Sequence, residues 1–356
     1  RERAISQGAF ASVNTGGCFR GLSAAELVRR ALEKDQRLEN DLSMMMSRIK
    51  GTKEYWNQKS SDLAAMDARL GPATWFLTLS CAEYKWEELE KYIRAVNPDI
   101  KDMGLKQLLV KDPATVSEFF ARKFKGFFEK VIRPHDKDGS LKEGPLGLVT
   151  DYFWRLEYQA RGAPHIHMKL WVKDAPVVGV DSNEKVVEFI SRHITCALPE
   201  AMENEQLHRN VKNFQMHKCS QSCLRYKPKM GAMKCRYAFP RKPSVDYVLN
   251  VTRDVIKSRR SQRRPQQKMY DLPRTHAERY INDYNPVVLQ EWGANMDLQF
   301  VGEKSRVLNS YITSYVTKAE KKSTKHIWDN LDQDKTVHAK LLKLAHETFR
   351  AVSYTH

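Results

Sequence analysis

Hydrophobic residues recur at helical spacing through residues 22–70, with charged residues between them and no proline. This pattern predicts an N-terminal helical segment over residues 1–70. Gly71-Pro72 then ends the helical pattern, because glycine and proline both disfavour its continuation. The aromatic and aliphatic run that follows, at residues 75–80, is typical of a buried strand.

Two further strand-like runs, at residues 148–159 and 165–172, are separated by a short segment that ends in Gly162-Ala163-Pro164. This spacing predicts a β-hairpin with a turn of about five residues. One more strand is predicted at residues 295–301. Helical patterns lie at residues 86–96, 117–131, 185–197, 306–322 and 335–349.

The chain of 356 residues has 60 Lys and Arg against 43 Asp and Glu, a formal net charge of +17. At about 150 residues per domain, this length predicts roughly two domains. The positive surplus favours a polyanionic partner, because each neutralised phosphate releases counterions. No apolar run approaches the roughly 18 residues that a membrane span needs, and no amphipathic anchor accompanies the charge. We therefore expect a nucleic acid partner and no membrane.

Three of the six cysteines lie close together, and a histidine precedes them. In a chain with no visible secretory signal, this clustering favours metal binding and a reducing compartment over disulfides. The candidate zinc ligands are His217, Cys219, Cys223 and Cys235. Four such ligands suit tetrahedral Zn²⁺, and thiolates are poor ligands of Mg²⁺. We expect a structural zinc-binding insertion over residues 205–243; the alternatives are His208 in place of His217, or buried free thiols.

Basic residues flank this cluster and also form a run at residues 256–268. Arginine and lysine side chains suit phosphate contacts. The candidate DNA-binding residues are Arg161, Arg225, Lys227, Arg236, Arg259, Arg260, Arg263 and Arg264. The basic run fits a solvated segment equally well.

His165 and His167 lie two residues apart in a strand-like run. Side chains at i and i+2 share one face of a strand, so the two imidazoles point the same way while Ile166 packs into the core. Glu157 and Gln159 share a face of the partner strand, and either one supplies an oxygen beside the two nitrogens. Such a site suits Mg²⁺ or Mn²⁺ and leaves positions open for a phosphate oxygen. The alternative interpretation of the histidine pair is a structural one.

Tyr311 and Tyr315 are spaced so that both phenols share a helix face, and Lys318 lies one turn beyond Tyr315. A phenol with a pKa of about 10 is a weak nucleophile at neutral pH. A metal ion on a scissile phosphate makes the phosphorus more electrophilic and neutralises developing charge. Attack by tyrosine would leave a 5′-phosphotyrosine and a free 3′-OH, and this linkage can be resealed without ATP. Lys318 would offset charge on the phosphate or the phenolate.

Tyr280 and Tyr284 have the same spacing. The Asn285-Pro286 that follows them is predicted to end a helix, because proline disfavours helical geometry in the residue before it. No lysine stands three residues after either tyrosine. The later tyrosine pair is therefore the better candidate.

Together these features resemble the three motifs of the HUH endonuclease superfamily in their usual order, namely the strand with Thr78 and Ser80, then His165-Ile166-His167, then Tyr315-x-x-Lys318. The surrounding phrases are similar to those of one branch, the N-terminal replication-initiator (Rep) domain of Helitron transposases. The similar phrases are residues 71–80, 157–167, 284–286 and the helix with the paired tyrosines.

The resemblance implies an α+β fold, in which a central antiparallel sheet with flanking helices bears the histidine pair. It divides the chain into an N-terminal helical segment (1–70), a nuclease domain (71–325) interrupted by the zinc-binding insertion (205–243), and a C-terminal helix (326–356). The implied cofactors are Mg²⁺ or Mn²⁺ for catalysis and Zn²⁺ for structure. The implied partners are single-stranded DNA of a transposon end and a helicase domain downstream in the full-length protein, in the nucleus.

The implied activity is metal-dependent cleavage and strand transfer of single-stranded DNA in rolling-circle transposition, through Tyr311 and Tyr315. Related Rep proteins often have a lysine where this chain has Ser314, which distinguishes the two tyrosines. Glu157 fits the acidic ligand of viral Rep proteins, with Gln159 as the alternative. The rival functions are a replication initiator of a plasmid or virus, a non-catalytic zinc-stapled DNA-binding module, and a hydrolase with a metal-activated water.

Overall fold

The structure is a computed structural model. It describes four stretches of the chain and three single residues. These are residues 53–158, 163–227, 231–249 and 270–303, with Arg29, Glu33 and Ser47. The helices predicted at 306–322 and 335–349, and most of the one predicted at 22–70, lie outside the described residues.

The chain divides into two units. One is Asp67–Ile312, and the other is composed of Arg1–Met66 and Thr313–His356. The sheet and both groups of candidate metal ligands belong to the Asp67–Ile312 unit.

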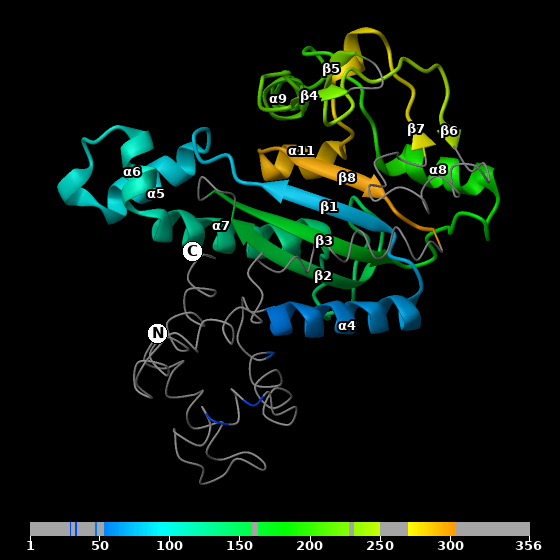
Figure 1. The fold of residues 1–356 in the computed structure, drawn as a ribbon, viewed down its shortest axis with the longest axis horizontal. Coiled ribbons are helices and arrows are strands. Elements are labelled where there is room, and N and C mark those ends of the chain that lie inside the picture. Colours follow the sequence, from blue (N-terminus) through cyan, green and yellow to red (C-terminus); the bar gives the residue numbers. More distant parts are fainter. Residues whose placement is uncertain are drawn as a thin grey trace. The chain divides into compact units, whose positions relative to one another are not determined.

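The centre of this unit is a four-stranded antiparallel sheet in the order β2-β3-β1-β8 (Figure 1). Its strands are β1 (Trp75–Ser80), β2 (Val149–Tyr158), β3 (Pro164–Val172) and β8 (Met296–Phe300). The sequence predicts all four at almost the same bounds, and β2 and β3 form the predicted hairpin. The protein is therefore an α+β protein with an antiparallel sheet, as expected.

Alternation of side chains gives the sheet one apolar and one polar face. Leu79 pairs with Ile166, and both are buried in the core. Thr78 pairs with His167 on one side and with Asp297 on the other, so these three side chains share the opposite face. A slip of one residue would bury the polar set, so burial of the apolar set fixes the register.

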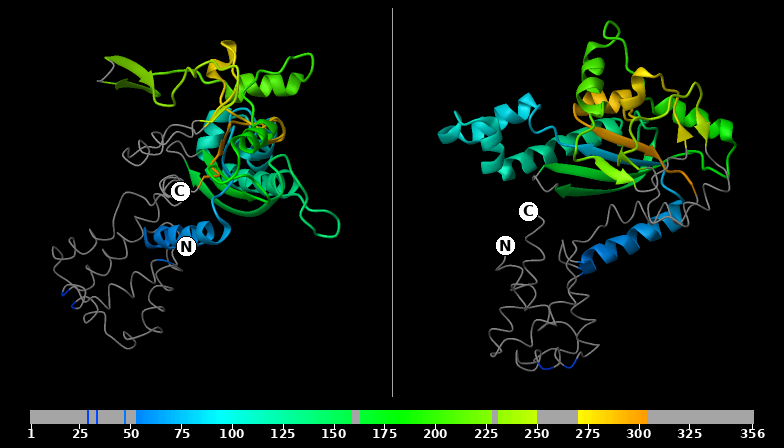
Figure 2. Two further views of the ribbon diagram at one scale, coloured as in Figure 1. Left: turned by 90° about the vertical axis from the view of Figure 1, so that its right-hand side faces the viewer. Right: turned by 45° about the horizontal axis from the view of Figure 1, so that its top comes forward.

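Helices that bury side chains in the same core as the apolar face include α5 (Glu87–Val96), α7 (Pro113–Phe127), α8 (Asn183–His193) and α11 (Pro286–Trp292) (Figures 1 and 2). Trp292 contacts Trp86 and Phe120 edge-on, with ring centroids 5.4 and 5.6 Å apart. Phe189 stacks on Trp75 at 5.3 Å. These rings join the helices and the sheet in one hydrophobic core.

Capping explains where two helices differ from the sequence prediction. α7 begins at Pro113 rather than at residue 117, because Asp112 accepts a hydrogen bond from the first turn and proline is favourable there. It runs on into a π-helical turn, η3 (Phe128–Ile132). Asn285 caps α11 in the same way, with proline in the first turn. The prediction that Asn285-Pro286 ends a helix is therefore wrong, because this pair begins one.

Tyr280 and Tyr284 do not share a helix face. Tyr280 closes a short 3-10 helix, η6 (Ala277–Tyr280), whereas Tyr284 precedes α11. Tyr284 is buried, and its hydroxyl donates a hydrogen bond to Ala197 O at 2.7 Å. Burial also raises the pKa of Tyr284 well above its ordinary value. A structural role accounts for this tyrosine.

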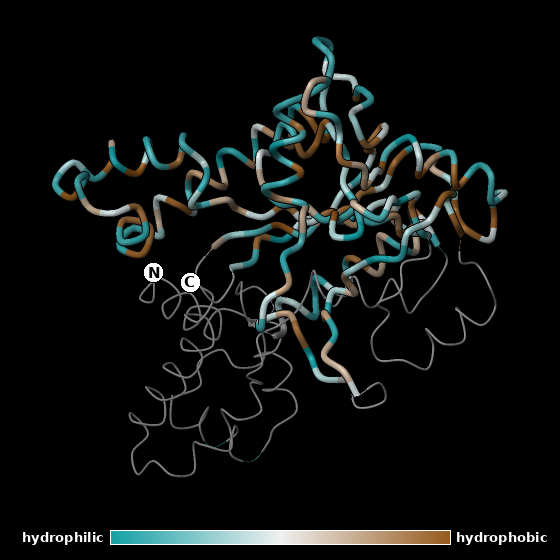
Figure 3. Tube along the Cα trace, turned by 90° about the horizontal axis from the view of Figure 1, so that it is seen from above, coloured by the Kyte–Doolittle hydropathy of each residue, from teal (hydrophilic) through white to brown (hydrophobic). Residues whose placement is uncertain are grey.

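The other described elements are α4 (Lys53–Leu70), η2 (Pro98–Ile100), α6 (Leu105–Lys111), α9 (Glu205–Asn210), the π-helical turn η4 (Val211–Gln215), and two strand pairs, β4 (Leu224–Lys227) with β5 (Ala232–Cys235) and β6 (Val248–Leu249) with β7 (Tyr270–Asp271). The end of α8 at His193 falls short of the predicted residue 197. Figure 3 shows hydrophobic and hydrophilic residues interspersed along the described trace. Each helix in the described ranges is too short or too polar to span a membrane.

Candidate functional site

The β2–β3 hairpin brings one glutamate and two histidines together on the polar face of the sheet. Antiparallel pairing places Glu157 opposite His165, and Arg155 opposite His167. Glu157 Oε2 lies 3.6 Å from His165 Nε2 and 3.4 Å from His167 Nε2. One potential ligand atom from each of the three residues lies within 4.8 Å of the other two, so one cation fits among them. This group is the candidate metal centre.

The charge of this group suits a divalent cation. The neighbouring His165 and His167, and to a smaller extent Arg155, hold the pKa of Glu157 well below its usual range, against the opposing effect of burial. The Glu157 carboxylate is therefore ionised at neutral pH. Each histidine side chain is 11% exposed, whereas the Glu157 side chain is 30% exposed. One ionised oxygen ligand and two imidazole nitrogens form a mixed donor set that could hold a divalent cation.

Residues of β1 orient the His167 ring. Thr78 Oγ1 lies 2.9 Å from His167 Nδ1, and the Phe76 ring stacks on the imidazole with centroids 5.9 Å apart. When His167 Nδ1 donates to the threonine oxygen, its Nε2 lone pair faces Glu157. The sequence motif contains Thr78, but only the β1–β3 register identifies it as the residue that orients the ring. His165 Nδ1 is buried and has no hydrogen-bond partner within the described ranges.

Several residues predicted to act at this centre lie outside the described residues. They are Gln159, Arg161, Tyr311, Tyr315 and Lys318. Of the two oxygen ligands predicted from the sequence, Glu157 is the one that the structure describes beside the histidines.

A second group of candidate ligands lies between η4 and the end of β5. His217, Cys219, Cys223 and Cys235 place their ligand atoms within 4.8 Å of one another. His217 Nε2 lies 3.3 Å from Cys235 Sγ, and the imidazole stacks on Phe239 at 4.5 Å. Cys223 and Cys235 are buried together with Phe239, whereas Cys219 is exposed. The four residues predicted from the sequence are thus adjacent in the fold.

His208, the alternative to His217, is not part of this group. It lies on α9, and its Nδ1 is 2.7 Å from Pro199 O. The hydrogen bond to a backbone carbonyl accounts for this histidine without a metal.

The thiols of the second group differ in acidity. Desolvation, together with the adjacent Cys235 and Cys223, raises the pKa of Cys219 to about 11. The backbone N–H of Ser220 lies 3.3 Å from Cys223 Sγ and lowers the pKa of Cys223. The neighbouring thiols thus favour ionisation of Cys223 and oppose that of Cys219, and a divalent cation among them would stabilise all three thiolates. The donor set, one imidazole and three thiols, fits tetrahedral Zn²⁺.

Basic side chains lie on the surface around the second group. Arg225 and Arg236 are exposed, and Arg225 pairs with Lys234 across β4 and β5. The Arg236 guanidinium lies over the Tyr237 ring, 4.6 Å from its centroid. Lys227 is the last residue of β4. The other predicted DNA-binding residues lie outside the described ranges: Arg259, Arg260, Arg263 and Arg264.

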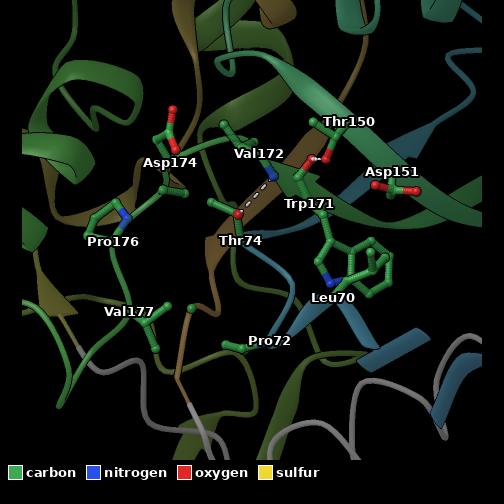
Figure 4. A pocket seen from close by; sticks show the side chains of 12 residues that line it. Leu70, Pro72, Thr74, Thr150, Asp151, Trp171, Val172, Asp174, Pro176 and Val177 are labelled. Atoms are coloured by element: carbon green, nitrogen blue, oxygen red, sulfur yellow. Dashed lines mark hydrogen bonds between the residues drawn. The ribbon is translucent and has the colours of Figure 1, made fainter. Parts of the chain in front are cut away.

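A pocket of about 230 Å³ lies at the end of β3 that is remote from the histidines. Figure 4 shows Thr74, Trp171 and Val172 among its lining residues, with Thr74 Oγ1 accepting a hydrogen bond from Val172 N at 3.1 Å. None of the residues of either candidate metal-ligand group lines it. This pocket is therefore separate from the candidate metal centre.

The described residues form an α+β domain with a central antiparallel sheet. They contain two groups of side chains that could hold a metal ion, and one of these groups lies on the sheet. Residues 7–170 match the family model described as "Helitron helicase-like domain at N-terminus". This match supports the resemblance of this part of the chain to a Helitron N-terminal domain. The match includes Glu157, His165 and His167 but ends before the Cys/His group. No curated protein matches the chain.

Proposed function

We propose that this protein is a metal-dependent endonuclease and strand transferase that cleaves single-stranded DNA at the end of a Helitron-type, rolling-circle transposon. The observation that carries the proposal is the convergence of Glu157, His165 and His167 on the polar face of an antiparallel sheet. The Helitron helicase-like domain supports the type of element, and the net charge of +17 supports a nucleic acid substrate. In this proposal the domain has the HUH nuclease fold, acts beside a helicase domain of the full-length protein and works in the nucleus.

Glu157, His165 and His167 would hold Mg²⁺ or Mn²⁺, with Gln159 as the alternative oxygen ligand. The bound ion would neutralise charge on the scissile phosphate. The low pKa of Glu157 keeps this ligand ionised, and a hydrogen bond donated by His167 Nδ1 to Thr78 Oγ1 would leave Nε2 to bind the metal. These residues therefore prepare the site before DNA enters.

Tyr315 and Tyr311 are the nucleophiles of the proposal, on the basis of their spacing and of Lys318. The phenol oxygen of one tyrosine forms a bond to phosphorus and gives its proton to solvent. The bond between phosphorus and the 3′ oxygen breaks, and that oxygen leaves with the electron pair and takes up a proton. A free 3′-OH of another strand then attacks the phosphotyrosine in the reverse reaction, which transfers the strand without ATP. Lys318 offsets negative charge on the phosphate.

The Cys/His group has a structural role in the proposal. His217, Cys219, Cys223 and Cys235 would hold Zn²⁺, which their donor set fits. Phosphates of the bound strand would contact Arg161, Arg225, Lys227, Arg236, Arg259, Arg260, Arg263 and Arg264. The exposure of Arg225 and Arg236 supports this assignment.

A covalent protein–DNA adduct tests the proposal. The chain is incubated with Mn²⁺ and a single-stranded oligonucleotide labelled at either end, and the products are separated on a denaturing gel. A 5′-phosphotyrosine retains the 3′ part of the strand, so we expect only the 3′ label to migrate with the protein. His165→Ala should abolish cleavage, and Tyr311→Phe/Tyr315→Phe should abolish the adduct. His135→Ala, at an exposed histidine outside the centre, is the control.

Each other outcome would indicate another function. Cleavage without an adduct would indicate a hydrolase with an activated water, and DNA binding without cleavage would indicate a zinc-containing binding module. Cleavage confined to a plasmid or viral origin would indicate a replication initiator. An adduct formed by the double phenylalanine variant would contradict the tyrosine assignment.

A further inference from the structure

Two large aromatic side chains of β2 are partly exposed although they belong to the sheet. Trp154 is 43% exposed and Tyr152 is 39% exposed, whereas the most exposed of the other described tryptophans, Trp56, is only 7% exposed. Both rings lie on the face of β2 that packs on α7, opposite to the side chain of Glu157. Aromatic rings left partly in water are typical of binding surfaces.

Packing beneath the two rings holds them in place. Trp154 packs edge-on against Phe124 with centroids 5.2 Å apart, and Tyr152 packs against Phe128 at 4.6 Å. Residues i and i+2 of a strand are about 7 Å apart, so the two rings form neighbouring steps along β2. A planar group that stacks on these rings therefore causes little further loss of side-chain entropy, because packing already holds the rings in place.

A cation borders the Tyr152 ring. The Arg133 guanidinium lies 5.6 Å from its centroid, and two backbone carbonyls accept hydrogen bonds from this arginine. Lys125 and Lys130 are exposed at the end of α7 and in the turn that follows it, and Lys125 Nζ lies 4.0 Å from Glu129 Oε1. Aromatic rings bordered by cations suit single-stranded nucleic acid, because bases stack on the rings while the cations neutralise phosphates.

The position of β2 connects these rings to the candidate metal centre. β2 is an edge strand of the four-stranded sheet (Figure 1), so no further strand of the described sheet covers its outer edge. Trp154 and Glu157 are three residues apart, or about 10 Å along the strand. A DNA strand whose scissile phosphate lies at Glu157 can therefore cross this edge and bring nearby nucleotides to Trp154.

We propose that Trp154 and Tyr152 form a base-stacking platform for nucleotides next to the scissile phosphate, with Arg133, Lys125 and Lys130 near their phosphates. The inference rests on the proposed nuclease function for the position of the scissile phosphate. Stacking itself needs no cleavage, so it is measured separately from catalysis.

Tryptophan fluorescence of the chain tests the platform. The experiment uses a Trp328→Phe background, because Trp328 lies outside the described residues and its emission would add to that of the described tryptophans. A short oligothymidylate is added without Mg²⁺ or Mn²⁺. We expect DNA to quench the emission and to lower the access of acrylamide, because Trp154 is the exposed tryptophan of the described part. Trp154→Phe, which keeps a ring against Phe124, should lose the quenching.

Binding affinity gives a second readout. Trp154→Ala should weaken binding of the oligothymidylate about tenfold in fluorescence anisotropy, a loss within the range that one stacked base contributes. Tyr280→Ala, at a tyrosine that is 40% exposed elsewhere on the unit, is the matched control and should bind normally.

Three results would overturn the platform. One is DNA binding that leaves the emission and the acrylamide access of Trp154 unchanged. Another is an equal loss of affinity in Tyr280→Ala. The third is shielding of Trp154 by the helicase part of the full-length protein without DNA, which would assign this surface to a protein contact. Normal quenching without a covalent adduct would instead contradict the nuclease proposal and leave the stacking platform supported.

Discussion

Lys169 is fully buried on the same face of β3 as His165 and His167. Its ammonium group bonds both carboxylate oxygens of Asp67, at 2.6 and 2.7 Å, and lies 5.3 Å from the centroid of the Trp171 ring. Burial lowers the pKa of Lys169 and raises that of Asp67, so desolvation opposes both charges and each partner offsets it only in part. Removing one partner should therefore lower the free energy of unfolding much more than removing both partners together.

Lys169→Met should lower the free energy of unfolding by about 3–5 kcal/mol, because it leaves the Asp67 carboxylate largely buried without its partner. Lys169→Met/Asp67→Leu should recover most of this loss. The folded-state pKa of the isolated carboxyl is raised, so the single variant loses stability as the pH rises through that pKa. We expect its melting temperature to fall further below wild type at about pH 8 than at about pH 5. Thermal unfolding followed by circular dichroism measures both effects, and a double variant as unstable as the single one would contradict them.

The sequence predicts contacts between residues that are close together in the chain better than contacts between residues that are far apart in it. Glu157 and the histidines could be placed together because a short hairpin determines which residues pair. Asp67 and Lys169 are 102 positions apart, and no local pattern links them. The bond between Thr78 and His167 is equally long-range, because it needs the register of β1 against β3.

At the scale of elements, strands were easier to predict than helix ends. Residues 75–80 and the two hairpin strands are rich in aromatic and aliphatic residues, and each closely follows a glycine or a proline, which helps to locate where it begins. Helix ends depend on single capping contacts. The sequence predicts that Asn285 ends a helix, but its side chain accepts a hydrogen bond from the first turn of α11. This helix is too short to show a helical spacing of hydrophobic residues.

The β4–β5 hairpin has little hydrophobic core of its own. Its buried cluster consists of Cys223, Cys235 and Phe239 with Leu224 packed against them, separate from the main core. Two short strands with so few buried side chains are marginally stable alone. If the Cys/His group holds zinc, the metal supplies most of the stability of this segment.

Removal of Zn²⁺ with a chelator should therefore unfold the segment around β4 and β5 and leave the four-stranded sheet folded. Limited proteolysis should then cut first between His217 and Phe239, and Zn²⁺ but not Mg²⁺ should restore protection. Cys219→Ser should behave like the chelated protein. Cys196→Ser is the control, because this buried thiol bonds Pro273 O and lies outside the group. Unfolding of the whole unit on chelation would contradict a separate, metal-held segment.

At the scale of the whole molecule, the basic residues that make up the net charge of +17 differ in whether a carboxylate pairs with them. Arg192 and Arg209 each form an ion pair with a glutamate one helical turn away. Arg225 and Arg236 are exposed and have no carboxylate partner within the described ranges. Arg225 and Arg236 are therefore more available to phosphates than Arg192 and Arg209 are.

The salt dependence of DNA binding separates local contacts from net charge. Arg225→Ala/Arg236→Ala should weaken binding of single-stranded DNA and reduce the slope of log affinity against log salt by roughly 1.4, since each lost phosphate contact contributes about 0.7 on a single strand. Arg192→Ala/Arg209→Ala removes the same charge from arginines that glutamates already pair, so its slope should stay close to wild type. Fluorescence anisotropy at several salt concentrations measures both slopes. Equal reductions in the two variants would mean that binding follows the total charge rather than the surface around the Cys/His group.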